Sequence, residues 1–331
     1  MKHLCKRSLQ IGLMLGAMLA IASAASAQTG AENYPDRPVR VIVPFAAGGG
    51  TDVLTRLITD ELTRALGKSF YVENAPGAGG TVATAQATRA APDGYTLFAT
   101  SPGPITIYPA LSSKLTYDAD KNVQNISVVS EGPGVAVVAK DSRFKSLQDV
   151  IAEAKAKPGT VKIASSGIGA FSHINCELFK ALAGIDVIHV PYRGAGPAAI
   201  DIIGGQVDMT IEYFPAVGAQ IEGGELRPLA VTSAARYPLR PDIPTFEDQG
   251  VKGYTTTSWV GLAAPAGTPK AIVDKLYGVI AKVAKEPAFI EKIAKLGVIP
   301  MANSPDDARV YLANERDTLR KLGTSNGISL N

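Results

Sequence analysis

The chain has 331 residues, of which 46% are hydrophobic, and it carries 33 basic and 30 acidic side chains. Three of the basic residues, Lys2, Lys6 and Arg7, lie in the first 27 residues, where there is no acidic residue. Subtracting these three leaves 30 basic against 30 acidic side chains in the rest of the chain. This balance excludes the strongly basic surface that binding to nucleic acid or to an anionic membrane requires.

The first 27 residues have the pattern of a cleavable secretory signal peptide. Three basic side chains precede an apolar stretch from residue 9 to residue 22, and Ala25-Ser26-Ala27 supplies the small-x-small pattern that signal peptidase recognises. A transmembrane anchor is the alternative, but the stretch is short for a membrane span. We expect cleavage after Ala27, export to the periplasm and loss of Cys5. Cys176 then remains alone, so we expect a buried thiol and no intrachain disulfide.

Strand-like and helix-like segments alternate along the first two thirds of the chain, which favours a parallel α/β architecture. The first group is expected as strand 39–45, helix 54–66, strand 70–73, helix 81–90 and strand 95–100. The second group is expected as strands 126–130 and 135–139, helix 146–156, strand 161–165, helix 172–183, strand 187–190, a helix ending at 204–205, and strands 207–211 and 226–232. The last third is mainly helical, with start signals at Thr268-Pro269 and Ser304-Pro305.

The segment Val41–Asp52, VIVPFAAGGGTD, is the most informative part of the sequence. A strand leads into three consecutive glycines, and a helix follows. Glycines let the backbone approach a ligand closely, and a helix N-terminus adds a positive partial charge. We interpret the segment as an anion pocket, because it has neither the Lys-Ser/Thr of a Walker loop nor the glycine spacing of a dinucleotide fingerprint. A tight turn with a purely structural role is the alternative.

Two further turns repeat this arrangement. Ala164–Ile174, ASSGIGAFSHI, places small and hydroxyl residues before a helix that starts near Ser172, and Thr100–Gly103, TSPG, follows another expected strand. Ligands bind at the carboxyl ends of strands in open sheets, so we expect the three turns to surround one site. Neither of the two longer loops contains Lys or Arg. Backbone amides, hydroxyls and bridging water are therefore expected to hold the anion.

Signals for catalysis and for metal or cofactor binding are weak. His173 and His189 share no metal-ligand spacing with each other or with Cys176. Ser172 and His173 are neighbours in sequence, and a nucleophile and its base rarely act from adjacent positions. We predict that the protein is not an enzyme and that it has no catalytic residues, metal or cofactor. The alternative is a secreted hydrolase that uses Ser172 and His173.

Four single residues have competing interpretations. Glu212 lies near the end of an expected strand, where it either faces a cleft or is solvated. Trp259 either forms a pocket wall or packs in the core. Asp52 is expected in the first turn of a helix, where it orients the glycine-rich loop without contacting the anion. Arg193 is the alternative source of positive charge, because Arg pairs readily with carboxylates.

Seven motifs together resemble the Bug family, the periplasmic solute receptors of tripartite tricarboxylate transporters. They are VRVIVPF at Val39–Phe45 with the following glycines and Asp52, VENAPGAGG at Val72–Gly80, PDGYTL at Pro92–Leu97, HVPYRGAGPA at His189–Ala198, GGQVD at Gly204–Asp208, LRPLAVTS at Leu226–Ser233 and GLAAPAGTP at Gly261–Pro269. Their order and spacing agree with the family over essentially the whole chain after the signal peptide.

The resemblance implies an α/β fold of two lobes, a type II-like periplasmic binding protein of the Venus-flytrap kind that the chain crosses twice. We place lobe one at residues 28–127 and 232–331 and lobe two at 128–231. It also implies a receptor that captures a small carboxylate, held by main-chain groups and water, for a two-component membrane permease or a sensor. A monomer is the expected state. The expected ligand-binding residues are Phe45, Ala47, Gly49, Asp52, Thr100, Ser101, Ser166, Gly169, Ala170, Ser172, His173, Tyr192, Glu212 and Trp259.

The sequence departs from the family pattern at three places. Ala170 stands where the family often has a hydroxyl residue, Arg193 replaces a usual lysine, and Ile107-Tyr108 occupies the neighbourhood of a common asparagine. Glu212 would in addition repel a second ligand carboxylate if it faced the cleft. These differences favour an aromatic acid or a mono- or dicarboxylate over a citrate-like trianion.

Overall fold

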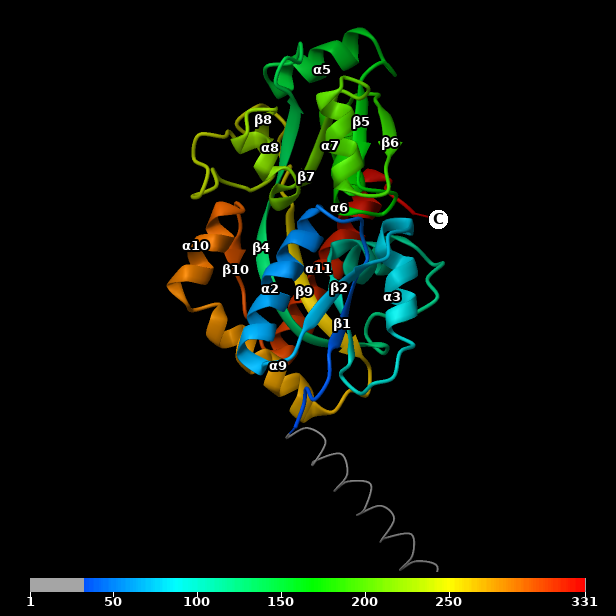
Figure 1. The fold of residues 1–331 in the computed structure, drawn as a ribbon. Helices are drawn as coiled ribbons and strands as arrows, with labels where there is room; N and C mark the ends of the chain where they lie inside the picture. Colours follow the sequence, from blue (N-terminus) through cyan, green and yellow to red (C-terminus); the bar gives the residue numbers. More distant parts are fainter. Residues whose placement is uncertain (1–32, 331) are drawn as a thin grey trace, which may run out of the picture.

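The computed structural model describes residues 33–330, so the expected signal peptide, its cleavage site and Cys5 lie outside the described residues. Ten strands form one curled sheet that runs from one lobe into the other, and helices pack around it in both lobes (Figure 1). This is the two-lobed α/β fold that the motifs predict. The central path of the sheet has the strand order β2-β1-β3-β9-β4-β7-β5-β6, with β8 and β10 each paired to β4.

The strands are β1 (Val39–Val43), β2 (Phe70–Asn74), β3 (Thr96–Thr100), β4 (Val123–Ala139), β5 (Lys162–Ser165), β6 (Ile188–Pro191), β7 (Met209–Tyr213), β8 (Leu226–Val231), β9 (Thr257–Pro265) and β10 (Ile299–Pro300). The α-helices are α2 (Gly50–Leu66), α3 (Thr81–Ala87), α4 (Tyr108–Leu111), α5 (Leu147–Ala156), α6 (Phe171–Ala183), α7 (Ala195–Ile203), α8 (Gly218–Glu222), α9 (Lys270–Val283), α10 (Pro287–Lys295) and α11 (Pro305–Asn326). Three short helical turns complete the chain: η1 (Ala78–Gly80), η2 (Gly103–Ile107) and η3 (Phe214–Ala216). The expected strands 126–130 and 135–139 are one continuous strand, β4.

Lobe one is built on the parallel strands β2, β1 and β3, with β9 antiparallel to β3. Strand β1 is apolar because helices cover both of its faces, which is typical of parallel sheets. Helix α2 buries Leu54, Ile58 and Leu62 at helical spacing in the same core. It ends at Gly67, which has a φ of 71° and occupies the left-handed position that glycine favours, as the sequence predicts.

Lobe two is built on the far end of β4, which pairs with β7 and β8, both antiparallel to it. Strand β5 lies parallel to β7, and β6 lies parallel to β5. Helix α6 packs Leu178 and Phe179 against this sheet. Helix α5 begins with a capping box, in which the Ser146 hydroxyl accepts from the Asp149 amide and the Asp149 carboxylate accepts from the Ser146 amide. The expected helix 146–156 is thus confirmed as α5.

The chain passes between the lobes at two places. Strand β4 pairs with β9 as far as Pro133 and with β7 from Gly134 onward, so one strand belongs to both lobes. The return path is fixed at Thr232, whose amide donates to the Gly134 carbonyl oxygen at 3.0 Å, and whose own carbonyl accepts from the Thr256 amide at 2.9 Å. These backbone bonds hold the two connections side by side.

The expected lobe boundaries differ from the observed pairing. The partner of β4 changes at Gly134, several residues after the expected boundary at 127–128. The proline-rich connection after β8 stays with lobe two, where Phe246, Val251 and Tyr254 are buried in its core. Local patterns could not reveal this, because a strand that continues through a hinge has the same sequence pattern on both sides.

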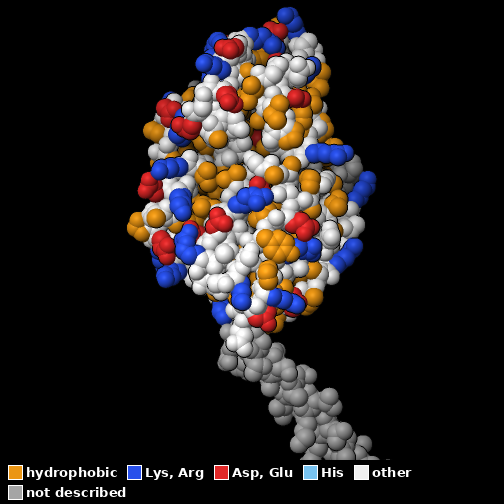
Figure 2. Space-filling view, viewed as in Figure 1, with side chains coloured by type: hydrophobic (Ala, Val, Ile, Leu, Met, Phe, Trp, Pro, Cys, Tyr) orange, Lys and Arg blue, Asp and Glu red, His pale blue; other side chains and the backbone are white. Residues whose placement is uncertain are grey.

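Charged side chains are distributed evenly on the visible surface. Figure 2 shows basic and acidic groups interspersed over both lobes, as the balanced composition predicts. Within residues 33–330, no helix is both long and apolar enough to cross a membrane.

Candidate functional site

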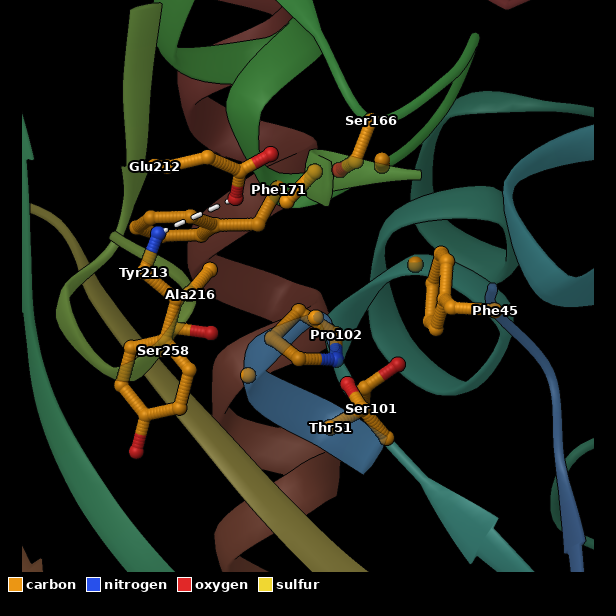
Figure 3. A pocket seen from close by; sticks show the side chains of 15 residues that line it. Phe45, Thr51, Ser101, Pro102, Ser166, Phe171, Glu212, Tyr213, Ala216 and Ser258 are labelled. Atoms are coloured by element: carbon orange, nitrogen blue, oxygen red, sulfur yellow. Dashed lines mark hydrogen bonds between the residues drawn. The ribbon is translucent and has the colours of Figure 1, made fainter. Parts of the chain in front are cut away.

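A small, partly open cavity lies between the two lobes. Lobe one contributes the glycine-rich loop with the start of α2 and the turn that precedes η2, and lobe two contributes the start of α6, the end of β7 and η3. Figure 3 shows the two groups on opposite sides, with Ser101 and Thr51 across the cavity from Glu212 and Ser166. The lining residues are Phe45, Gly49, Gly50, Thr51, Ser101, Pro102, Gly103, Ser166, Ala170, Phe171, Ala195, Glu212, Tyr213, Ala216 and Ser258.

Asp52 holds the glycine-rich loop of lobe one in place. Its side chain is 3% exposed and accepts hydrogen bonds from the Gly48 amide at 3.0 Å, from Asn74 Nδ2 at 2.9 Å and from Arg56 Nε at 3.0 Å. Burial opposes ionisation, but the hydrogen bonds from Arg56, Gly48 and Asn74 outweigh it and hold the pKa of Asp52 below its ordinary value. Asp52 does not line the cavity, and its position fits the expected orienting role.

The close approach of the two lobes occurs at Gly50, whereas the sequence points to Gly49. A Cβ atom added at Gly50 would lie 3.1 Å from the Tyr213 ring and 3.3 Å from the Ala216 amide nitrogen, both in lobe two. The same atom at Gly49 would meet only the Ala46 carbonyl oxygen, at 3.6 Å. Gly49 instead caps α2 in an extended conformation, with the Gly50 amide beginning the helix.

The matching loop of lobe two is held by hydroxyl groups. Ser172 lies in the first turn of α6, and its Oγ accepts from the Ser166 amide and bonds to Ser166 Oγ, both at 2.9 Å. Ser172 is fully buried and points into its own loop, so Ser166 is the hydroxyl that reaches the cavity. Ala170 caps α6 with no side-chain hydrogen bond. The first amides of α6 therefore have no side-chain acceptor at the N-cap, and Ala170 and Phe171 line the cavity.

The TSPG turn contributes one polar side chain. Ser101 is 4% exposed, and its Oγ has no hydrogen-bond partner among the described residues. Thr100 is buried against β9 and does not line the cavity. Gly103 lies so close to Gly79 that an added Cβ would be 2.6 Å from the Gly79 carbonyl oxygen. The turn therefore packs tightly against the neighbouring loop.

Glu212 faces the cavity, which resolves one of the open interpretations. It is 4% exposed, its Oε2 accepts from the Tyr213 amide at 3.1 Å, and its Oε1 has no partner within residues 33–330. Burial raises the pKa of Glu212, and the nearby polar groups of Ser166, Ser172 and Tyr213 reduce that shift only in part.

The lobes also touch outside the cavity. The Tyr108 hydroxyl, in lobe one, donates to the Ile168 carbonyl oxygen of lobe two at 3.0 Å. Gly169 lies under the Tyr108 ring, where an added Cβ would be only 2.0 Å from a ring carbon. Gly169 thus serves the contact between the lobes and does not line the cavity.

Comparison with known proteins identifies the chain. Residues 54–325 match the model of the tripartite tricarboxylate transporter family receptor. The chain belongs to this family. It is 35% identical over 303 residues to the protein BugT of Bordetella pertussis, covering 91% of this chain and 93% of BugT.

Two solved receptors of known ligand are similar in structure. Rpa4515 of R. palustris with adipate is 33% identical and superposes with a TM-score of 0.87 over 89% of this chain and 99% of that one. MatC (Rpa3494) from Rhodopseudomonas palustris with bound malate is 31% identical, with a TM-score of 0.82 over 87% of this chain and 99% of that one. The family is one of transporter receptors, so this receptor is not an enzyme.

The geometry agrees with this conclusion, because Ser172 and His173 do not form a catalytic pair. Ser172 Oγ is bonded to Ser166, while His173 Nδ1 accepts from the Gly169 amide at 3.1 Å. The His173 ring stacks on His189, with centroids 4.3 Å apart. Neither histidine lines the cavity of the receptor.

The structure does bring together three groups that the sequence spacing separates. The ligand atoms of His173, Glu177 and His189 lie within 4.8 Å of one another. His173 Nδ1 and His189 Nε2 already have hydrogen-bond partners, the Gly169 amide and Ser165 Oγ, and Glu177 pairs with Lys180 at 3.0 Å. All three groups are thus engaged within the protein.

Three other expected site residues lie elsewhere. Trp259 is fully buried in the core, where its Nε1 donates to Glu315 Oε2 at 2.6 Å, so the pocket-wall interpretation is wrong. Ala47 is exposed outside the cavity. Tyr192 lines a separate groove with Arg193, and its hydroxyl donates to Asp201 at 2.6 Å.

Sequence reasoning missed several residues that line the cavity. Thr51, Pro102 and Phe171 are sequence neighbours of expected ligand-binding residues, so the loop motifs were a sufficient signal for them. Tyr213 and Ala216 come from the end of β7 and η3, and Ser258 comes from β9. Tyr213 and Ser258 adjoin the expected site residues Glu212 and Trp259, whereas no local motif marks Ala216. All three reach the cavity through the pairing of β4 with β7 and β9.

Proposed function

We propose that this receptor captures a small carboxylate, either an aromatic acid or a mono- or dicarboxylate, in the cavity between its lobes. It acts as a monomer in the periplasm, after removal of the signal peptide, and presents the acid to a two-component membrane permease or to a sensor. The ligands named for Rpa4515 and MatC, adipate and malate, support a carboxylate as the bound group.

The observation that carries the proposal is the convergence of two helix N-termini on one cavity. Gly50 and Thr51 from α2 and Ala170 and Phe171 from α6 all line it. The first amides of a helix have no partner within the helix, and the helix dipole adds about half a positive charge at that end. An anion placed between the two ends would receive hydrogen bonds from both lobes.

The rest of the lining suggests the chemical character of the ligand. Phe45, Phe171 and Tyr213 supply apolar and aromatic surface. Among the described lining residues there is no Lys, Arg or His, which disfavours a ligand with several uncompensated negative charges.

A thermal-shift screen of the mature protein tests this proposal. A panel of benzoate, succinate, adipate, malate and citrate is compared with the neutral amides of the same acids. Binding to the native state alone raises the melting temperature by mass action, so at least one carboxylate should raise it while its amide does not. Calorimetry then gives the stoichiometry, which we expect to be one. If the melting temperature responds to none of a broad set of carboxylates, the proposed function is wrong.

The two kinds of membrane partner make different predictions in cells. A permease partner requires the receptor for uptake of the labelled acid, so deletion of the receptor should abolish uptake at low concentration. A sensor partner leaves uptake unchanged and makes acid-induced transcription depend on the receptor. Complementation with the Gly50→Val variant, which we expect to lose binding because its side chain would collide with Tyr213 and Ala216, serves as the matched control for both measurements.

A further inference from the structure

The carboxyl group of Glu212 is buried beside the hydroxyls of Ser166 and Ser172, without a charged partner. All five residues of β7 are buried, and Glu212 is itself 4% exposed. A buried carboxyl group is unfavourable unless hydrogen bonds or an opposite charge compensate it. Oε2 has one such bond, from the Tyr213 amide, whereas Oε1 has none among residues 33–330.

A second polar atom of the same kind lies across the cavity. In the described part of the chain, five buried side-chain atoms lack a hydrogen-bond partner, and two of them, Ser101 Oγ and Glu212 Oε1, belong to residues that line this one cavity. Ser101 comes from lobe one and Glu212 from lobe two, and Figure 3 shows them on opposite sides. Because buried polar atoms almost always find a partner, the pair indicates a polar ligand that bridges the lobes.

The charges around Glu212 determine which form of the carboxyl group suits an anionic ligand. An ionised Glu212 is only an acceptor and would repel a carboxylate, and the described lining residues include no cation to offset this. A protonated carboxyl group can instead donate a hydrogen bond to a carboxylate, so that the two groups share one proton and one charge.

The neighbouring elements offer no charge that would keep Glu212 ionised. Its pKa is raised by burial, and the groups that oppose the shift are the hydroxyls of Ser166 and Ser172 and the amides of Tyr213 and Ser166. Strands β4 and β5 and helices α6 and α7 pack against β7. Their titratable side chains that could face it are Glu131, Lys162, His173, Cys176, Glu177, Lys180 and Asp201, and none of these is among the groups that shift Glu212.

We propose that Glu212 binds the ligand as a neutral acid, with Oε1 keeping its proton and donating it in a hydrogen bond to a carboxylate oxygen of the bound anion. This inference rests on the proposed function, because it requires a carboxylate ligand. No covalent bond changes, and the ligand stays ionised. Ser101 Oγ donates to the same ligand from lobe one. The site therefore selects an acceptor group at Glu212 and disfavours an ammonium group there.

Two substitutions at one position separate this role from a structural one. Glu212→Gln keeps the shape and supplies an N–H donor, so the affinity for the tightest-binding acid of the panel should change by less than about fivefold. Glu212→Leu removes the donor and should weaken binding by at least about tenfold, the usual effect of losing a hydrogen bond to a charged group. Thermal melting without ligand controls for folding of both variants.

Infrared difference spectroscopy detects the protonated carboxyl group of Glu212. The complex of the wild-type protein with the tightest-binding acid of the panel at pH 7.5 should show the carbonyl stretch of a protonated carboxyl group, and the corresponding complex of Glu212→Gln should lack this band. A matched ligand pair adds an independent readout: succinate should bind more tightly than 4-aminobutanoate, which carries an ammonium group at the far end.

The possible failures are distinct from one another. A wild-type complex without the protonated carboxyl band, or a Glu212→Gln variant that loses binding as fully as Glu212→Leu, would overturn the neutral-acid role. Tighter binding of 4-aminobutanoate than of succinate would also overturn it, since it would show an ionised Glu212 paired with a cation. If no carboxylate binds at all, the proposed function itself fails, and this inference fails with it.

Discussion

The two loops that face each other across the cavity reach a similar geometry by different chemistry. In lobe one, the glycine-rich loop contributes Thr51 to the cavity lining, and it is held by Asp52, Arg56 and Asn74, which do not line the cavity. In lobe two, the hydroxyls of Ser166 and Ser172 hold the loop from within, next to the Glu212 carboxyl group. Lobe one therefore presents backbone and hydroxyl groups, and lobe two presents backbone together with a titratable acid.

This difference separates general anion binding from selectivity. A backbone loop at a helix N-terminus accepts any carboxylate of suitable size, because its amides carry no information about the rest of the molecule. Side chains such as Glu212 and Ser101 distinguish donors from acceptors. We expect changes in the glycine-rich loop to reduce the binding of all acids alike, and changes at Glu212 or Ser101 to alter which acid is preferred.

The largest expected effect is at Gly50. Valine at this position would press its side chain into the Tyr213 ring and the Ala216 amide, where an added Cβ already lies 3.1 and 3.3 Å away. The lobes could then not close on a ligand, and we expect Gly50→Val to weaken binding by more than about 100-fold, as measured by calorimetry. The protein should remain folded by circular dichroism, because the contact lies between the lobes.

The neighbouring glycine supplies the control for that substitution. Gly49→Ala adds a Cβ that meets only the Ala46 carbonyl oxygen, at 3.6 Å, in an extended conformation that any residue adopts. Its affinity should change by less than about threefold. Equal losses at Gly49 and Gly50 would show that the loop, rather than the contact between lobes, is the sensitive feature.

These two glycines illustrate how far the sequence can predict this site. Period and turn signals predicted α2, its end at Gly67 and the strand–glycine–helix loop, because those features depend on local preferences. The choice between Gly49 and Gly50 depends on Tyr213, which is 163 positions away from Gly50 and belongs to the other lobe. Trp259 and His173 were misjudged for the same reason, since their surroundings come from distant parts of the chain.

An intermediate effect is expected at Asp52. Asp52→Asn weakens the bonds to Gly48, Arg56 and Asn74, so the glycine-rich loop should lose order and the affinity should fall about tenfold for every acid tested. The free energy of unfolding should fall by about 1–2 kcal/mol. Asp60→Asn, on the exposed side of the same helix, is the control and should change neither quantity measurably.

The effect of Asp52→Asn on the free energy of unfolding should depend on pH. The pKa of Asp52 is lower in the folded protein than its ordinary value of 3.8, so its contribution to stability is present above that value and is lost as the pH falls through the folded-state pKa. The difference in unfolding free energy between wild type and Asp52→Asn should therefore be largest near neutral pH and shrink below pH 3.8. A difference that grows on acidification, in urea titrations at several pH values, would contradict this assignment.

The smallest expected effect is at Arg193, and it decides whether a side-chain cation holds the ligand. Arg193 is exposed and lines the groove with Tyr192 and Ile168, next to the cavity but outside its lining. If helix N-termini hold the carboxylate, Arg193→Gln removes only a screened, distant charge, and calorimetry should show less than a tenfold loss of affinity, or 1.4 kcal/mol. Arg193→Lys keeps the charge and should bind as tightly as the wild type, whether helix N-termini or a side-chain cation hold the carboxylate. If Arg193→Gln loses much more than tenfold in affinity, Arg193→Lys does not, and Gly50→Val is tolerated, the anion site lies in the neighbouring groove and not in the cavity.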